Sequence, residues 1–452
     1  MIAPARVAAY DILCAVSSGN ADLPTAIAIA RGGLHDDRDR ALAAEIAAGV
    51  QRWRAALDHL VVEFSRRALD RLDPEVVEIL RLSAYQLLHL TRVPASAVVD
   101  DAVQLTRRAG KTSASGFVNA VLRTISRKRA DLPLPVRPAD PADRDAALAY
   151  FSVTLSHPRW LAARWLDRFG FNAAEAWLQF DNHAAPLTLR ANRLQMTAAQ
   201  LSERLVAEQV QTRPGRFAPD ALLVEEGYPL RGAGLETGWF VVQDEASQLV
   251  ALLAAGVPGM RVLDTCASPG GKTTAVAAAM ENQGLLVACD VRGRRVELLR
   301  KTVAATGATN VRIVQADLLT PLPFSRPFDS VIVDAPCSGL GTLRRDPDIR
   351  WRRREADLAA FAAAELNMLR HAADAVAPGG RLVYATCSSE PDENEAVVDA
   401  FLAAVPGFAP VNAHDAAPAL PAAVVDARGH LRTQPHLHDL EAFFAAVLQR
   451  QR

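Results

Sequence analysis

The sequence lacks the paired cysteines that structural metal sites and disulfide scaffolds require. Its five cysteines are Cys14, Cys266, Cys289, Cys337 and Cys387, and no two of them form a CxxC pair. That spacing argues against a structural zinc site and against a small fold held by disulfides. We therefore expect reduced thiols, which fit a cytosolic protein, and no bound metal.

A signal peptide, a long apolar run and an excess of charge are also missing. Asp11 interrupts the N-terminal stretch where a signal peptide needs an apolar core. No uninterrupted apolar run approaches the roughly 20 residues that span a bilayer. The net charge of −1 means that any nucleic-acid site must be a local patch. We expect a soluble, cytoplasmic monomer with no membrane partner.

The 452 residues are too many for one ordinary domain, and their patterning divides them into four stretches. Residues 1–130 carry apolar residues at helical spacing, which predicts an all-helical domain. Residues 131–146 contain four prolines and form a linker. Residues 147–235 mix helix and strand patterns, which predicts a small α+β domain. From 236 to 452 short apolar runs alternate with helical patterns, which predicts a mostly parallel sheet with helices on both faces. Within this last stretch, Pro406 to Gly429 is expected to be a loop.

A glycine-containing turn follows the first of these apolar runs, in VLDTCASPGGKTT. A P-loop would need a glycine where Cys266 stands, and the GxGxxG dinucleotide fingerprint is absent. What remains is a strand, a turn and a helix, with Asp290 placed 19 positions after Gly271. Asp290 can therefore accept hydrogen bonds from a ribose diol, Asp317 can meet an adenine amine, and Asp334 ends the next strand. Each aspartate taken alone could instead cap a helix.

Cys337 and Cys387 stand at the ends of two apolar runs, and polar, turn-forming residues follow each of them. A free thiol has a pKa of about 8.5 and needs a cationic neighbour to be a good nucleophile at neutral pH. Lys272 is one candidate neighbour. The pattern therefore predicts thiol chemistry beside a bound cofactor, but it does not rank the two cysteines.

The motifs CASPGGKT, DAPCSGLGTLRRDPDIRW and YATCSSEPDENE resemble those of the RNA 5-methylcytosine methyltransferases of the RsmB/Nop family. The resemblance implies that Cys387 attacks carbon 6 of cytosine and that Cys337 assists product release. Asp334, which lies close to Cys337 in the sequence, and Lys272 are further candidates for catalysis. The resemblance also implies a site for S-adenosylmethionine, formed by Cys266, Ala267, Ser268, Pro269, Gly270, Gly271, Lys272, Asp290, Asp317 and Asp334.

The N-terminal stretches RLSAYQLLHLTRVPASAVVDDAVQLTRR and GFVNAVLR resemble the NusB-like RNA-binding domain. The two resemblances together imply an all-α NusB-like domain, a small α+β domain that precedes the methyltransferase and binds RNA, and a Rossmann-like class I methyltransferase domain. This fusion is typical of the branch that methylates 16S ribosomal RNA.

An arginine-rich segment with an aromatic residue follows the first cysteine motif. Arg344, Arg345, Arg350 and Trp351 are candidates for RNA contacts, because guanidinium groups suit phosphates and an aromatic ring can stack on an unpaired base. The alternative is a solvated helix start whose arginines pair with nearby acidic residues.

The resulting prediction is an enzyme that transfers a methyl group from S-adenosylmethionine to carbon 5 of a cytosine in 16S ribosomal RNA. The alternatives are the same reaction on transfer RNA or 23S ribosomal RNA, a DNA cytosine methyltransferase, or a non-catalytic NusB-like RNA-binding factor. A DNA enzyme would use Cys337 as its nucleophile and would not require Cys387.

Overall fold

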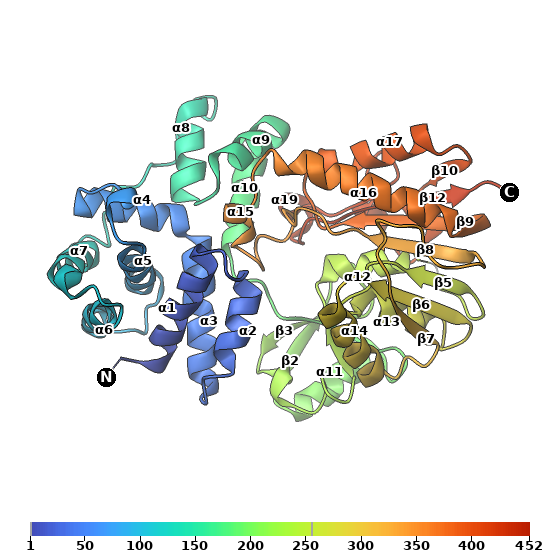
Figure 1. Ribbon diagram of the computed structural model, residues 1–452, viewed down its shortest axis with the longest axis horizontal. Helices are drawn as coiled ribbons and strands as arrows, with labels where there is room; N and C mark the ends of the chain where they lie inside the picture. Colours follow the sequence, from blue (N-terminus) through green and yellow to red (C-terminus); the bar gives the residue numbers. More distant parts are fainter. Residues whose placement is uncertain (1, 255) are drawn as a thin grey trace. The chain divides into compact units, whose positions relative to one another are not determined.

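The computed structural model describes residues 2–254 and 256–452, which form two compact units (Figure 1). The first unit comprises Met1–Ala184 together with Leu343–Arg353. The second comprises Ala185–Thr342 and Arg354–Arg452. The first unit is therefore discontinuous in sequence, because its last segment lies within the stretch that the sequence assigned to the α/β domain.

The first unit is helical, as the N-terminal pattern predicted. Its helices are α1 (Pro4–Ser17), α2 (Leu23–Arg31), α3 (Asp37–Arg52), α4 (Arg54–Ser65), α5 (Pro74–His89), α6 (Ala95–Arg108), α7 (Ser115–Arg127), α8 (Arg144–Ala149), α9 (Arg159–Phe169), α10 (Phe171–Asn182) and α15 (Ile349–Arg352). The proline-rich stretch 131–143 forms no helix or strand, and it lies inside the first unit; the last three residues of the expected linker belong to α8.

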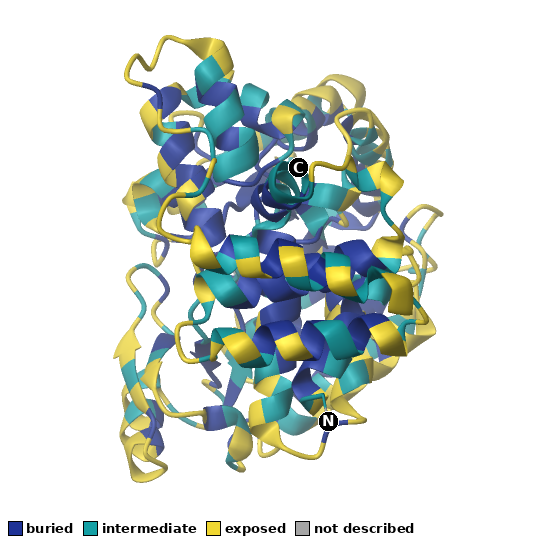
Figure 2. Cartoon of the chain, turned by 90° about the vertical axis from the view of Figure 1, so that its left-hand side faces the viewer, coloured by how far each residue is buried: buried dark blue, intermediate teal, exposed yellow. Residues whose placement is uncertain are grey.

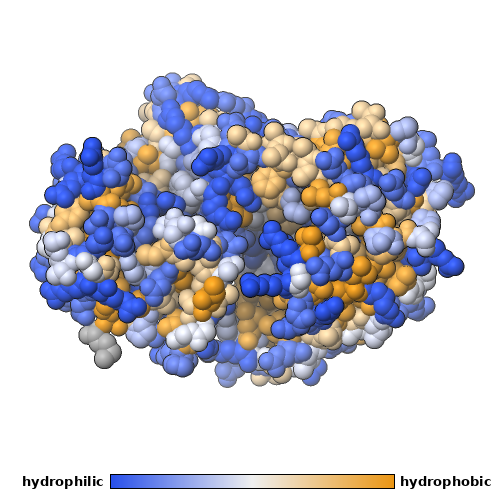
Figure 3. Space-filling view, viewed as in Figure 1, coloured by the Kyte–Doolittle hydropathy of each residue, from blue (hydrophilic) through white to orange (hydrophobic). Residues whose placement is uncertain are grey.

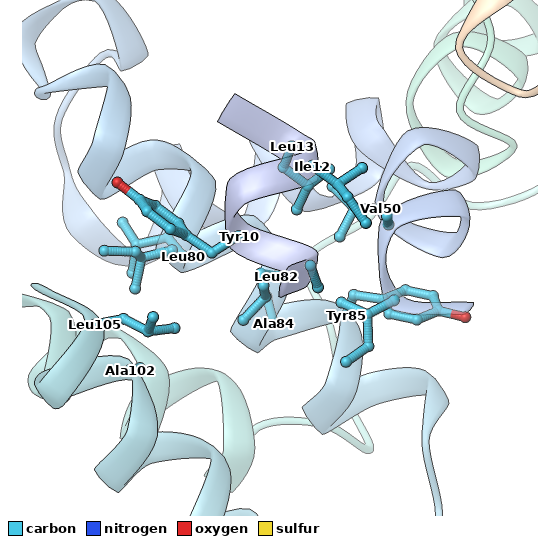
Figure 4. Packing of buried hydrophobic residues seen from close by; sticks show 14 of the residues in the cluster. Tyr10, Ile12, Leu13, Val50, Leu80, Leu82, Ala84, Tyr85, Ala102 and Leu105 are labelled. Carbon is cyan, nitrogen blue, oxygen red and sulfur yellow. The ribbon is translucent and has the colours of Figure 1, made fainter. Parts of the chain in front are cut away.

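The core of the N-terminal helices depends on close contact between α3 and α5. Figure 4 shows Tyr85 of α5 beside Val50 of α3, with Leu82 on the next turn. A Cβ at Gly49 would lie 1.9 Å from the Tyr85 ring, so only glycine leaves room for it. The hydroxyl of Tyr85 donates to Glu45 Oε1 at 2.7 Å, which satisfies the polar end of the ring. Buried and exposed residues alternate along the helices in Figure 2, as expected for helices that each bury one face.

The second unit begins with a small antiparallel sheet in the order β2-β3-β1-β4. Its elements are β1 (Thr188–Ala191), α11 (Ala198–Ala207), β2 (Gln211–Pro214), β3 (Ala221–Glu226) and β4 (Phe240–Val242). The sequence placed α9 and α10 in the same small domain as this sheet. In the structure these two helices group with the first unit instead.

The large sheet of the second unit has the strand order β10-β12-β9-β8-β5-β6-β7, with β11 paired to β12. The strands β5 to β9 run parallel, and β10, β11 and β12 form antiparallel pairs. The elements are α12 (Glu245–Leu252), β5 (Arg261–Asp264), α13 (Gly271–Ala279), β6 (Leu285–Asp290), α14 (Gly293–Thr306), β7 (Val311–Gln315), β8 (Phe328–Asp334), α16 (Asp357–Asp374), β9 (Val376–Thr386), α17 (Glu395–Ala404), β10 (Phe408–Val411), α18 (Ala413–Ala416), β11 (Leu431–Arg432), α19 (Pro435–His438) and β12 (Phe444–Arg450).

Helices cover both faces of this sheet, as predicted. Val331 and Val333 of β8 pack in one cluster with α16 and α17, whereas Ile332 packs in another with α13 and α14. The alternation follows from the two-residue period of a strand. The order also makes β5 the switch point, because β6 lies on one side of it and β8 on the other. In open parallel sheets ligands bind at the carboxyl ends of the strands at such a point.

The expectation of a loop from Pro406 to Gly429 is wrong in part. β10 lies inside this range and pairs with β12 at the edge of the sheet. Pro410 obscured the strand in the sequence, but proline is tolerated at a sheet edge. Hydrophilic and hydrophobic residues are interspersed on the surface in Figure 3. Among the described residues, no helix is long and apolar enough to cross a membrane.

Candidate active site

The loop after β5 turns sharply at Gly270. This residue has φ +106°, and its N–H donates to the carbonyl oxygen of Ala267 at 2.8 Å. A Cβ here would lie 3.0 Å from Leu299 Cδ1 and 3.2 Å from Thr302 Cβ. Both the backbone angle and the available space therefore favour glycine. Helix α13 begins at the next residue, so the unpaired N–H groups of its first turn follow directly on the loop.

Asp264, the last residue of β5, is buried next to this loop with one oxygen unused. Its Oδ2 accepts a hydrogen bond from Thr273 Oγ1 at 2.7 Å, whereas its Oδ1 has no partner among the described residues. Burial raises the pKa of Asp264 to about 7; the Thr273 hydroxyl opposes this rise and the Asp334 carboxylate adds to it. An unsatisfied buried acceptor beside a glycine turn fits a ligand that donates a hydrogen bond there.

Asp290 holds the loop to the end of β6. One oxygen accepts the N–H of Ser268 at 3.3 Å, the other accepts the N–H of the residue two positions after Asp290 at 3.2 Å, and Arg295 lies 3.4 Å away. A carboxylate has about four lone-pair sites, so acceptor capacity remains. Asp317 lies two residues beyond β7 and is exposed, and its Oδ1 accepts the N–H of Leu319 at 2.9 Å.

The structure brings the predicted cofactor residues to one edge of the sheet. They lie at or just beyond the carboxyl ends of β5, β6, β7 and β8: Cys266, Ala267, Ser268, Pro269, Gly270, Gly271, Lys272, Asp290, Asp317 and Asp334. Burial, with neighbouring carboxylates, raises the pKa of Cys266, so this thiol stays protonated and is a poor nucleophile.

Lys272 and Asp334 form an ion pair between the cofactor loop and β8. Lys272 Nζ lies 2.7 Å from Asp334 Oδ2 and 5.6 Å from the centre of the Phe443 ring. Burial lowers the pKa of the Lys272 amine, but Asp334, and less strongly Cys387, outweigh this effect and the net shift is upward. Lys272 is therefore charged at neutral pH and stands within electrostatic reach of the Cys387 sulfur.

The two predicted cysteines meet at the ends of adjacent strands. β8 and β9 are paired in parallel with Asp334 opposite Ala385, so Cys337 and Cys387 follow the two strands at nearly the same level. Their sulfur atoms lie 3.3 Å apart. Both cysteine residues are partly exposed.

The surroundings of Cys337 disfavour loss of its thiol proton. The hydrogen bond to Cys387 raises the pKa of Cys337, and burial and the carboxylates of Glu393 and Glu365 raise it further. The Lys272 ammonium interacts favourably with charge on Cys387, so the two thiols differ in their electrostatic surroundings. The sequence alone could not make this distinction.

Comparisons with known proteins show which family the chain belongs to. The signature of the family described as 16S rRNA methyltransferase RsmB/F matches residues 251–449. The chain is 33% identical over 451 residues to ribosomal RNA small subunit methyltransferase B of Pseudomonas syringae pv. tomato, covering 98% of this chain and 96% of the relative. It is 34% identical over 405 residues to the protein of the same name from Pseudomonas putida, covering 89% of each. The chain belongs to the RsmB/F family of 16S rRNA methyltransferases.

The RsmB/F assignment also accounts for the other parts of the chain. A NusB family signature matches residues 3–127, and a ferredoxin-like domain signature of RsmF/B-like methyltransferases matches 157–231. The crystal structure of PH0851 superimposes on the whole chain with a TM-score of 0.81 at 24% identity and is itself 99% covered. A methyltransferase homolog protein from Pyrococcus horikoshii matches 68% of the chain, and is 99% covered, with a TM-score of 0.58 at 25% identity. The predicted family and fold class are confirmed.

The arginine-rich segment of this RsmB/F chain belongs to its first compact unit. Arg350 is 0% exposed. Its Nη1 donates to the carbonyl oxygen of Ser156 at 3.1 Å and to Asn182 Oδ1 at 2.9 Å, and its Nη2 donates to the carbonyl oxygen of Asp181 at 3.2 Å. Burial lowers the pKa of Arg350 to about 9. These contacts correct the expectation that Arg350 binds RNA, because the side chain is buried and its Nη1 and Nη2 groups donate inside the fold.

The other three residues of that expectation are partly exposed, and Arg344 and Trp351 have contacts within the first unit. The guanidinium of Arg344 lies 4.3 Å from the centre of the Phe180 ring. Trp351 Nε1 donates to the carbonyl oxygen of Gln51 at 2.6 Å. Arg345 is likewise half-buried. Their exposed surfaces leave room for RNA contacts, but packing alone explains why the segment is ordered.

Sequence reasoning missed two groups in this RsmB/F site. Asp264 stands inside the quoted VLDTC run, where its position at the end of β5 was a usable signal. Glu393 lies inside the quoted YATCSSEPDENE motif, and its buried contacts are described below. Among the described residues, no group of histidine, cysteine and acidic side chains is arranged to hold a metal ion.

Proposed function

We propose that this chain transfers a methyl group from S-adenosylmethionine to carbon 5 of a cytosine in 16S ribosomal RNA, through a covalent adduct with Cys387. The observation that carries the proposal is the thiol pair, with its sulfur atoms 3.3 Å apart beside a charged lysine and a glycine-turn ligand loop. Carbon 5 of cytosine is too electron-poor to attack a methyl group unaided. A nucleophile added to carbon 6 removes that obstacle, and a thiolate is suited to this addition.

The residues of the loop fit S-adenosylmethionine, which when bound supplies the methyl group. Gly270 gives the close backbone approach, and Asp290 retains acceptor capacity for a ribose diol. The unpaired Oδ1 of Asp264 would accept a hydrogen bond from the ammonium of the methionyl part. Asp317, exposed after β7, would meet the adenine amine.

The chain's own residues then divide the chemistry. Cys387 adds through its thiolate to carbon 6, and Lys272 stabilises the negative charge on that sulfur before the addition. Asp334, held by Lys272, would bond the cytosine amine or ring nitrogen and so favour the addition. After methyl transfer, carbon 5 loses its proton, the carbon 5–carbon 6 double bond re-forms, and the Cys387 thiolate leaves. Cys337 stands next to the departing sulfur and assists this last step.

RNA recognition is assigned to the partly exposed Arg344, Arg345 and Trp351, and to the NusB-like domain. The target cytosine must leave its stack to expose carbon 6, which favours a loop or an opened helix. Bisulfite sequencing of ribosomal RNA from cells with and without the protein identifies the modified nucleotide. Loss of one 5-methylcytosine from 16S ribosomal RNA is the expected result, and loss from transfer RNA or 23S ribosomal RNA instead would assign a different substrate.

The roles of the two cysteines are tested by replacing each one. We expect Cys387→Ala to abolish both turnover and the covalent complex, because it removes the nucleophile. We expect Cys337→Ala to leave the addition intact and slow release, so that a protein–RNA adduct persists through denaturing electrophoresis. Each variant is incubated with labelled RNA and S-adenosylmethionine. An adduct trapped in Cys387→Ala, with none in Cys337→Ala, would reverse the two roles.

A further inference from the structure

A buried carboxylate connects the two loops that carry Cys337 and Cys387. Glu393, in the short helix Pro391–Glu393 after β9, is 0% exposed. Its Oε1 accepts the N–H of Ser338 at 2.6 Å, and its Oε2 accepts the hydroxyls of Ser338 at 2.6 Å and of Ser388 at 2.5 Å. Ser338 directly follows Cys337, and Ser388 directly follows Cys387.

The hydrogen bonds of this cluster form a consistent set. Each serine hydroxyl gives its single proton to Glu393, and the two hydroxyl oxygens lie 3.2 Å apart. Ser388 Oγ in turn accepts the N–H of Glu390 at 3.1 Å. A fully satisfied buried network of this kind fixes its members in one geometry. The Glu393 network therefore determines where the residue after each cysteine lies.

A second buried acid lies behind Glu393. The hydroxyl of Tyr384 is 2.5 Å from the Glu393 carbonyl oxygen and 3.0 Å from Glu365 Oε2. Burial raises the pKa of Glu365 to about 9, and the Glu393 carboxylate adds to the rise. Glu365 is therefore uncharged at neutral pH. Of these two buried acids, only Glu393 therefore contributes a negative charge near the thiols.

We propose that Glu393 is a positioning residue of the methyl transfer: through Ser338 and Ser388 it holds the sulfur atoms of Cys337 and Cys387 at the separation that lets one thiol attack and the other assist release. The inference rests on the function proposed above for the two cysteines. It assigns to Glu393 a task that neither cysteine can perform, since each cysteine lies on a separate loop.

The placement of the charge gives Glu393 a second effect on the pair. A fixed negative charge close to Cys337 disfavours the thiolate of Cys337 and keeps its proton in place. The proton then stays on the thiol assigned to release, while Cys387, beside Lys272, is free to be the nucleophile. A neutral group in the place of Glu393 could hold the two cysteine loops together, but it would not disfavour the thiolate of Cys337 relative to that of Cys387.

The proximity of the Cys337 and Cys387 sulfur atoms can be tested without RNA or cofactor. The full-length protein is equilibrated with reduced and oxidised glutathione. Formation of a Cys337–Cys387 disulfide consumes one oxidised glutathione and yields two reduced ones, so the equilibrium reports the effective concentration of one thiol at the other. We expect Glu393→Gln and Ser388→Ala each to lower this effective concentration at least tenfold. Ser330→Ala is the matched control, since Ser330 is a buried serine of β8 whose hydroxyl has no partner among the described residues.

A separate experiment tests the effect of the Glu393 charge on ionisation of the Cys337 thiol. The rate of alkylation of Cys337 is followed against pH in Cys387→Ala, with and without Glu393→Gln. Removal of the carboxylate should move the midpoint to lower pH by about 1 unit or more. Loosened packing alone would speed alkylation at every pH without moving the midpoint.

The outcomes separate this inference from the proposed function. An effective concentration that is unchanged or higher in both variants, with an unmoved alkylation midpoint, would overturn the role of Glu393. If the wild-type protein forms neither an adduct nor 5-methylcytosine, the proposed function fails, while the glutathione equilibrium still decides whether Glu393 sets the thiol spacing. With both correct, Glu393→Gln slows adduct release and formation together, and Ser330→Ala changes neither.

Discussion

Replacement of Arg350 by alanine should destabilise the first unit far more than it weakens RNA binding. The guanidinium is fully buried and donates to three backbone carbonyls and one side-chain amide at 2.9–3.3 Å. Alanine would leave these acceptors without partners and open a cavity. Removing one partner of a buried charged network typically costs about 3–5 kcal/mol, and we expect a loss in that range.

Tryptophan fluorescence during urea unfolding measures this loss where it occurs. Five of the six tryptophans lie in the first unit, and Trp165 and Trp177 are almost fully buried there. Arg354→Ala is the control, because Arg354 is an exposed arginine just beyond this segment, at the start of the second unit's last stretch. Its replacement should change the unfolding free energy by less than about 0.5 kcal/mol. RNA affinity is measured under conditions where both variants remain folded.

Two results would contradict a structural role for Arg350. If the unfolding free energy of Arg350→Ala is within about 1 kcal/mol of the wild-type value, the guanidinium does not stabilise the first unit in the way its contacts indicate. If RNA affinity falls strongly in the same variant, Arg350 acts on RNA after all. The Arg350 side chain would then have to be exposed, and not buried, in the protein that binds RNA.

Three further predictions concern the second unit. Asp290→Ala should weaken S-adenosylmethionine binding, since charge-assisted hydrogen bonds contribute about 1.5–3 kcal/mol each; unchanged affinity in calorimetry would contradict the assignment. Gly270→Ala should also weaken it, because a side chain at φ +106° and 3.0 Å from Leu299 costs about 1–3 kcal/mol; equal affinity would show that the turn does not shape the site. Glu365 holds its proton up to a pKa of about 9 when folded but loses it near 4.3 when unfolded, so stability should fall by about 1.4 kcal/mol per pH unit between these values. Glu365→Gln should flatten this slope in urea unfolding from pH 6 to 9, and an unaltered slope would place the pH dependence elsewhere.

The parts of the fold that could be predicted are those encoded by local sequence. Strands buried on both faces form continuous apolar runs, so the parallel strands were visible without knowledge of their partners. The turn at Gly270 and the acidic residues after each strand are also local features. The meeting of Cys337 and Cys387 followed from the rule that parallel strands end at the same edge of the sheet.

The parts that could not be predicted depend on contacts between distant residues. In the sequence Arg350 is one arginine among several, and its burial is decided by carbonyl groups about 170 to 195 positions earlier. Nothing in the spacing of α9 and α10 shows that they pack with the N-terminal helices rather than with the small sheet. The contacts of Glu393 likewise depend on how three segments fold together.

The discontinuity of the first unit has a consequence for the order in which the protein matures on the ribosome. The buried carboxylate of Asp348 accepts the N–H of Leu23 at 3.1 Å, and Arg350 satisfies carbonyls at the end of α10. The segment that supplies both is synthesised roughly 170 residues after Ala184. At about 5–20 residues per second, the helical unit must wait roughly 10–30 s for its last piece. Until Leu343–Arg353 has emerged, the nascent N-terminal helices therefore exist in an incomplete form whose interior polar groups are still bound to water.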